Sequence, residues 1–171
     1  MAWTTPRTWV NGETVAEGEM NTHVRDNLTA LYDDKTSEVS GLLTGPIETV
    51  TVSATAATGT INFDCITQAT LYYTTSASAN WTLNVRGSSG TSLNTLLATG
   101  QSITVTFLAA QGATAYYQSA FTIDGNAVTP KWQGGTAPTA GNASSVDAYT
   151  ITIVKTGSAA FTAFAAQTRF A

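Results

Sequence analysis

Residues 147–157 read DAYTITIVKTG, and their alternation decides the fold class. Tyr149, Ile151 and Ile153 occupy every second position, with threonines between them. Successive side chains of a strand point to opposite faces of a sheet, so this stretch predicts a strand with one apolar face and one hydroxyl-bearing face. An amphipathic helix would instead repeat its apolar residues at spacings of three and four.

A similar alternation extends over most of the chain. After Gly45-Pro46, which ends any helix, the sequence is rich in β-branched and aromatic residues, and apolar pairs such as Val50 and Val52 are expected to face inward. Glycine-rich turns separate the segments. The predicted strands are 48–54, 59–65, 69–75, 81–87, 101–109, 114–123, 126–133, 147–157 and 159–170.

These strands predict a mainly β protein, an antiparallel β-sandwich of jelly-roll type. No βαβ pattern occurs, which argues against a nucleotide-binding α/β fold. A chain of 171 residues suits one packed domain with an appendage. We therefore expect an N-terminal extended peptide and short α-helix in residues 1–45, followed by a β-sandwich body in residues 46–171.

Charge is distributed unevenly between these two parts. Residues 1–45 carry seven acidic and three basic side chains, whereas residues 46–171 carry four of each. Four scattered bases cannot form a phosphate-binding patch, so we expect no nucleic-acid partner. No apolar run reaches the roughly 20 residues of a membrane helix, so we expect no membrane partner. A surface of Thr, Ser, Asn and Gly depends little on salt, which suits a protein working outside a cell.

The N-terminal part carries a helical pattern from Thr14 to Tyr32. Met20, Val24, Leu28 and Leu31 form a narrow apolar stripe along it. An isolated helix of this length is marginally stable in water, so the stripe must lie against something. Its near-heptad spacing favours a short parallel bundle of copies, and packing on the chain's own β body is the alternative.

Two tryptophans precede this helix. Trp3 and Trp9 flank Pro6, which disfavours helix and central strand alike. Tryptophan is enriched among the residues that anchor interfaces, so we predict that this segment docks on a partner; folding back onto the chain's own core is the alternative. His23, the only histidine, is expected to be a solvated or interhelical side chain.

Residues for catalysis are scarce. His23 has no second histidine near it, and Cys65, the only cysteine, is expected to be a small buried apolar residue. The carboxylates of the body are Glu48, Asp64, Asp124 and Asp147. A hydrolase would need two of them to converge, and Asp147 with Asn142 supplies too few oxygens for calcium. We expect no catalytic residue, no metal and no cofactor.

Aromatic residues offer a candidate surface site. In the pairs Tyr72-Tyr73 and Tyr116-Tyr117, one ring is expected in the core and the other outside, because adjacent strand residues face opposite ways. We take Tyr73, Tyr117 and Trp132 as candidates for binding a surface glycan.

Two sets of residues carry a resemblance to phage proteins. PRTWVNGE (6–13) and MNTHVRDNLTAL (20–31) are similar to N-terminal segments of bacteriophage tail and minor structural proteins. The body resembles a terminal domain of fibre and virion structural proteins from cyanophages and other aquatic phages. Its matching stretches are SANWTLNVRGSSGTSLNTLLATGQSITVTFLAAQGATAYY (78–117), DGNAVTPKWQGGTAPTAGNASSVDAYTITIVKTG (124–157) and AAQTRFA (165–171).

The resemblance implies a non-enzymatic, homotrimeric virion appendage, assembled in the host cytoplasm. The N-terminal segment would attach to other virion proteins of the tail or capsid, and the β body would project outward, where a host-surface glycan is a candidate ligand. Two alternatives stay open: a capsid decoration, cement or head-fibre protein, and a free carbohydrate-binding module.

Overall fold

The computed structural model describes residues 5, 8–28 and 47–171. The chain falls into two compact units, residues 1–46 and residues 47–171, which we call the N-terminal unit and the β unit. This division lies one residue from the boundary that the Gly45-Pro46 break predicts.

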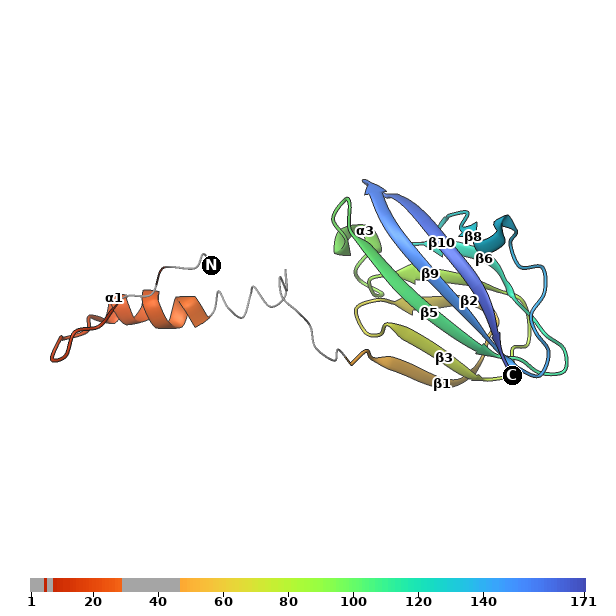
Figure 1. The fold of residues 1–171 in the computed structure, drawn as a ribbon, viewed down its shortest axis with the longest axis horizontal. Helices are drawn as coiled ribbons and strands as arrows, with labels where there is room; N and C mark the ends of the chain where they lie inside the picture. Colours follow the sequence, from red (N-terminus) through yellow and green to blue (C-terminus); the bar gives the residue numbers. More distant parts are fainter. Residues whose placement is uncertain (1–4, 6–7, 29–46) are drawn as a thin grey trace. The chain divides into compact units, whose positions relative to one another are not determined.

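The N-terminal unit contains a short helix (Figure 1). α1 (Glu17–Met20) continues directly into η1 (Asn21–Asp26), a π-helical stretch. Glu17 and Glu19 lie in the first turn, where the positive end of the helix dipole favours acidic side chains. The predicted short N-terminal helix is confirmed.

The β unit is built from strands, which confirms a mainly β fold. Two short helical segments, α3 (Leu93–Leu96) and η2 (Gln133–Gly135), interrupt them. The strands are β1 (Val50–Ala56), β2 (Gly59–Asp64), β3 (Thr70–Thr75), β4 (Trp81–Arg86), β5 (Ser102–Ala110), β6 (Gln118–Ile123), β7 (Asn126–Ala127), β8 (Lys131–Trp132), β9 (Val146–Gly157) and β10 (Ala160–Phe170).

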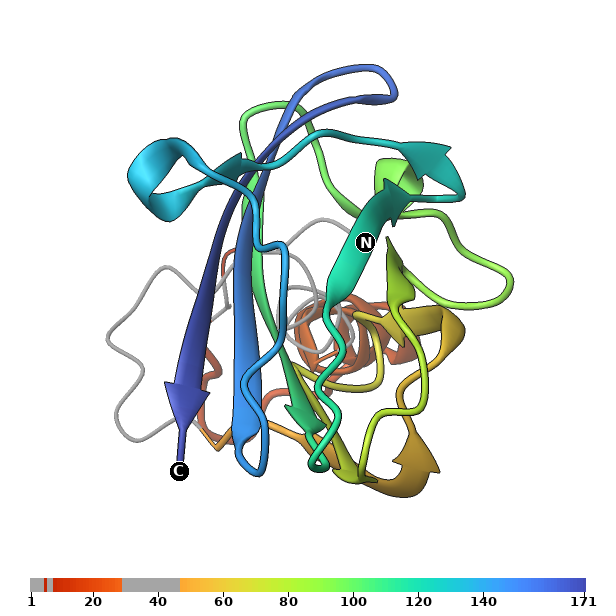
Figure 2. The same cartoon turned by 90° about the vertical axis from the view of Figure 1, so that its right-hand side faces the viewer.

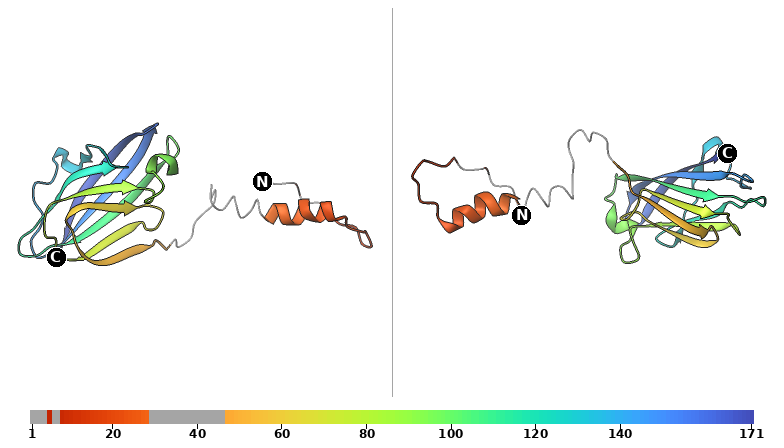
Figure 3. Two further views of the ribbon diagram at one scale, coloured as in Figure 1. Left: turned by 180° about the vertical axis from the view of Figure 1, so that it is seen from behind. Right: turned by 90° about the horizontal axis from the view of Figure 1, so that it is seen from below.

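Two sheets form two layers. The larger has six strands in the order β1-β3-β5-β9-β10-β8, and the smaller has four in the order β2-β4-β6-β7. Figure 1 looks onto the larger sheet, and the left view of Figure 3 looks from the opposite side, with the smaller sheet in front. Figure 2 shows the two layers beside each other, β9 and β10 in blue on one side and β6 in teal on the other.

Strand direction differs from the prediction. Up to β6 the chain alternates between the sheets, with β1, β3 and β5 in the larger and β2, β4 and β6 in the smaller. Neighbours within a sheet are thus connected through a strand of the other sheet, and they run parallel in β1–β3, β3–β5, β2–β4 and β4–β6. Only β5–β9, β9–β10 and β6–β7 are antiparallel. The prediction of antiparallel pairing throughout is wrong, because the short loops join the two layers rather than close hairpins.

One core joins both layers. The indole of Trp81 on β4 meets the rings of Phe107 on β5 and Tyr149 on β9 edge to face, with centroids 5.8 and 5.6 Å apart. Tyr149, Ile151 and Ile153 are fully buried, as the alternation in residues 147–157 predicts. The apolar faces of the two sheets therefore cover each other.

α3 is held by charged side chains from both layers. Asp124, directly after β6, accepts hydrogen bonds from the backbone N–H of Leu93 and Asn94 at 2.6 and 2.9 Å. The buried ammonium of Lys155 on β9 donates to the carbonyls of Asn94 and Leu97 at 2.5 and 2.8 Å. The N–H groups at the start of this short helix and the carbonyl groups at its end therefore have hydrogen-bond partners. Because one partner comes from each sheet, the helix links the two sheets.

The predicted strand 114–123 is shorter than expected. β6 begins only at Gln118, because the backbone N–H and carbonyl of Tyr116 bond to the side chain of Gln111 instead of to a neighbouring strand. The Gln111 amide donates to the Tyr116 carbonyl at 2.8 Å and accepts from its N–H at 3.0 Å. The predicted strand 126–133 is likewise reduced to β7 and β8, which flank Pro130.

Candidate functional site

The outer face of the larger sheet is the most distinctive surface of the β unit. Strand register places its outward side chains in rows that cross β1, β3, β5, β9 and β10. One row holds Val50, Thr70, Thr106, Thr150 and Ala166, and the next holds Val52, Tyr72, Leu108, Ala148 and Thr168. We call this surface the threonine face.

The threonine face carries no charge. Along these five strands, all within the described residues, each outward position holds an aliphatic, aromatic or hydroxyl side chain. Thr104 and Thr152 lie opposite each other in a third row, with their hydroxyl oxygens 2.9 Å apart. The charged side chains of β9, Asp147 and Lys155, point inward and are buried.

β1 reverses the pattern of its neighbours. Val50 and Val52 were predicted to face inward, but they are 49% and 64% exposed. Thr51 takes an inward register position but is itself exposed, and it donates to the side-chain oxygen of the buried Gln68 at 2.8 Å. The prediction failed because alternation alone does not say which face the sheet turns to the core; that is set by pairing, here Thr51 beside the buried Leu71.

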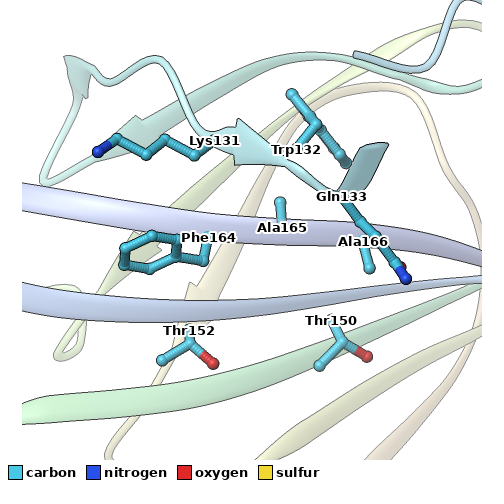
Figure 4. A pocket seen from close by; sticks show the side chains of 8 residues that line it. All are labelled: Lys131, Trp132, Gln133, Thr150, Thr152, Phe164, Ala165 and Ala166. Atoms are coloured by element: carbon cyan, nitrogen blue, oxygen red, sulfur yellow. The ribbon is translucent and has the colours of Figure 1, made fainter. Parts of the chain in front are cut away.

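A shallow groove lies at the far edge of this face, beside β8 (Figure 4). Its volume is about 390 Å³, and Phe164, 47% exposed, forms one wall together with Lys131. The Lys131 ammonium lies 5.7 Å from the centre of the Phe164 ring. Thr150 and Thr152, on the neighbouring strand β9, also line the groove. An exposed ring beside hydroxyl groups and one cation can contact a ligand that has both apolar and polar faces.

The aromatic residues proposed from the sequence as surface candidates take different positions. Tyr73 packs on the core, its ring edge to face with Phe107 at 5.3 Å, and burial raises its pKa. Trp132 also packs against the core, and in Figure 4 it points away from Phe164. Tyr117 is half-buried in the loop before β6. The predicted surface position of Tyr73 is therefore wrong, and Tyr72 is the outward member of that pair.

The N-terminal candidates are only partly described. Trp3, Pro6 and Leu31 lie outside the described residues. Trp9 is 39% exposed, and its ring lies edge to face with that of His23 at 6.3 Å. The described residues of the predicted stripe, Met20, Val24 and Leu28, are 46%, 40% and 61% exposed.

The outer face of the smaller sheet has a different chemistry. Asn84 on β4 donates to the side-chain oxygen of Asn62 on β2 at 2.8 Å and accepts from the Thr122 hydroxyl on β6 at 2.8 Å. In the next row Arg86 pairs with Asp64 at 2.6 Å. These polar side chains satisfy one another across the parallel strands.

Three of the four carboxylates in the β unit have separate structural partners. Asp64 pairs with Arg86 and Asp124 caps α3. Asp147, fully buried, accepts from the Asn142 amide at 2.6 Å and from the Gln111 amide at 3.2 Å. Asn142 turns its N–H groups toward Asp147, as a hydrogen-bond donor does and a calcium ligand does not.

Gly141 completes this buried cluster by leaving room for it. A Cβ at this position would lie 2.0 Å from the Tyr116 carbonyl oxygen and 3.1 Å from an Asp147 carboxylate oxygen. The close approach of three segments at Asp147 therefore requires glycine here.

Cys65 does not have the environment of a reactive thiol. Burial, reinforced by the carboxylates of Asp64 and Asp124, raises its pKa to about 12. A thiol that stays protonated at neutral pH is a poor nucleophile. Within residues 8–28 and 47–171, no three His, Cys, Asp or Glu side chains group closely enough to hold a metal ion.

Comparisons with protein-family models, curated proteins and solved structures found no match to this chain. Among the described helices, none has the length and apolar character needed to cross a membrane.

Proposed function

We propose that the chain is a non-enzymatic structural component of a phage virion. In this proposal it forms a short trimeric fibre, attached through the N-terminal unit, with the β unit projecting outward toward the host surface. The division into two compact units with contrasting surfaces carries the proposal. The sequence resemblance to phage structural proteins supports it.

The exposed stripe on the helix supports self-association. Met20, Val24 and Leu28 repeat every fourth residue and each is at least 40% exposed. Three copies of such a stripe cover one another in a parallel bundle. The trimer would place three N-terminal segments at one end, so that a weak contact of each with the particle is strengthened by avidity.

Attachment is tested by replacing the aromatic anchors. The double variant Trp3→Ala, Trp9→Ala is expected to remain assembled but to disappear from purified particles, because burying a large apolar side chain contributes roughly 1.5–3 kcal/mol per site. The matched control replaces Thr5 and Thr8 in the same segment with alanine and should be incorporated normally. Normal amounts of the tryptophan variant on particles would contradict attachment through this segment.

A capsid decoration, cement or head-fibre role is the alternative within the same class, because both proposals use the same two units and differ in the place of attachment. Electron microscopy of particles labelled with antibodies to the β unit distinguishes them: label on the tail supports a tail fibre, and label on the capsid supports a head protein. Absence of the chain from purified particles would contradict both.

A free carbohydrate-binding module is the second alternative, and the groove at Phe164 favours it. A pyranose could lie on the exposed ring while Thr150, Thr152 and Lys131 contact its hydroxyl groups. A glycan array would show selective binding that Phe164→Ala abolishes, whereas Phe170→Ala, at an exposed ring outside the groove, would leave binding intact.

A further inference from the structure

The reversed alternation of β1 calls for a cover over its outer side. In β9 Tyr149, Ile151 and Ile153 face the core and Thr150 and Thr152 face out, whereas in β1 Val50 and Val52 face out and Thr51, itself exposed, takes the position on the core side. Alternating apolar residues are expected on the buried side of a strand. The valines of β1 meet that expectation only if something other than this β unit covers them.

The exposed valines continue into a wider apolar row. Val52 lies beside Tyr72 of β3, which lies beside Leu108 of β5, followed by Ala148 of β9. β1 is also the edge strand of the sheet. Its sequence, VTVSATA, contains none of the charged residues or prolines that usually keep an edge strand from pairing with another chain.

The absence of charge on this face selects a second copy of the chain as its occupant. Two identical charged faces repel each other, whereas two copies of the threonine face meet without like charges. Hydroxyl groups such as those of Thr70 and Thr106 both donate and accept hydrogen bonds, so the row can pair with its own copy. A nucleic acid or an anionic surface would find no cation among the outward side chains of these five strands.

The size of the face is consistent with a weak contact that association of the helices strengthens. Five strands about 4.8 Å apart, each contributing about seven residues of about 3.3 Å, span roughly 24 by 23 Å. Two such faces together bury about 1,100 Å², close to the lower limit of roughly 1,200 Å² for specific interfaces. Residues 29–46 tether each β unit to its helix, so association of the helices raises the effective concentration of the faces.

We propose that copies of the chain meet through the threonine face, centred on β1, β3 and β5, in addition to their contact along the helix. The inference rests on the proposed self-association and assigns it a second surface. It makes the outer side of β1 part of a shared core between β units.

A charge placed in the centre of the face tests the proposal. In the full chain, Leu28→Asp first weakens the helix contact, and sedimentation velocity then measures the remaining self-association. Adding Thr106→Glu should raise its dissociation constant at least tenfold, because each copy would bury a carboxylate without a partner. The control Thr82→Glu places the same charge on the half-buried outward position of β4 in the smaller sheet and should change the constant less than twofold.

Footprinting of the unmodified chain provides a second readout. Hydroxyl radicals should label Tyr72 and Leu108 less in the assembled wild type than in the Leu28→Asp, Thr106→Glu variant, whereas Ile66, 55% exposed in the loop after β2, should be labelled equally in both. Circular dichroism checks that both glutamate variants fold. Labelling of the wild type at high and at low protein concentration should show the same protection of Tyr72 and Leu108 without the use of a variant.

Three results would overturn the proposal. Equal effects of Thr106→Glu and Thr82→Glu would show that the face is not the contact. A wild-type assembly with Tyr72 and Leu108 fully labelled would leave the helix trimer standing without this interface. Protection of Tyr72 that requires added oligosaccharide, and not higher protein concentration, would show that the face binds a glycan.

Discussion

The outer faces of the two sheets of the β unit differ in their chemistry. On the smaller sheet, Asn62, Asn84 and Thr122 bond to one another across three strands, and Arg86 is paired with Asp64. On strands β1, β3, β5, β9 and β10 of the larger sheet the outward side chains are hydroxyl, aliphatic and aromatic. The first surface is satisfied within one chain, and the second leaves valines exposed. The comparison teaches that two sheets can share one core and still differ in how far their outer side chains find partners within the chain.

The largest effect is expected from the core that both faces share. Trp81→Ala removes the indole that contacts Phe107 and Tyr149 across the layers, so we expect a loss of about 3–5 kcal/mol in the free energy of unfolding. Urea denaturation followed by circular dichroism measures it. The two sheets should unfold together, and separate transitions would contradict a single core and with it the comparison between its two sides.

The next effect separates the two faces directly. Asn84 is 8% exposed, and it accepts from the Gly125 N–H at 2.9 Å in addition to its side-chain partners. Asn84→Ala leaves these groups without their partner, so we expect a loss of about 1–3 kcal/mol in unfolding free energy.

Thr106→Ala is the matched control on the larger sheet. Measured in dilute Leu28→Asp protein, where copies are apart, it should change the unfolding free energy by less than about 0.5 kcal/mol. Equal losses for Thr106→Ala and Asn84→Ala would show that the threonine face is as tightly bonded within the chain as the smaller sheet.

How much of this could be predicted from sequence depends on the range of the forces involved. The burial of Tyr149, Ile151 and Ile153 follows from local alternation, and the structure confirms it. The direction of pairing does not, because the loop after β1 has the same length and composition whether it closes a hairpin or crosses between layers. Val50 and Val52 were placed on the wrong side for a related reason: their local pattern is correct, but its orientation is fixed by β3.

The candidate surface shows the same limit. A rule of opposite faces correctly divides Tyr72 from Tyr73 but does not say which of them is outside, and the contact of Tyr73 with Phe107 decides it. Phe164 was missed because it lies in a run of alanines and threonines that reads as a buried strand. The groove at Phe164 depends on β8 lying beside it, a parallel contact that joins residues more than 30 positions apart.

A rise of pH above about 9 is expected to lower the stability of the core. Burial raises the pKa of Cys65 from 9.0 to about 12 and also raises the pKa of Tyr149. The unfolded chain therefore loses these protons first, so the β unit keeps its full stability below about pH 9 and loses it above, by at most about 1.4 kcal/mol per pH unit for each group.

Urea midpoints on either side of pH 9 measure this loss. In the Cys65→Ala variant the unfolding free energy should fall less steeply with pH. Between about pH 6 and pH 8 the self-association of the chain through the threonine face should stay constant, because threonine, valine and leucine carry no titrating group there. A rise of stability above pH 9 would contradict the assigned burial of the thiol and the phenol.

The smallest effect concerns the ion pair on the smaller sheet. Arg86 and Asp64 are 26% and 29% exposed, so solvent screens their attraction and Arg86→Gln should cost only about 0.2–1 kcal/mol of unfolding free energy. The loss should shrink in roughly 1 M salt, where charges are screened within about 3 Å. A double-mutant cycle with Asp64→Asn isolates the pair from the packing of the Arg86 stem. The same salt should leave self-association through the threonine face unchanged or slightly stronger, because that contact contains hydroxyl and apolar groups alone. If salt instead dissociates the copies, charged residues hold them together, and the contact lies on a surface other than the threonine face.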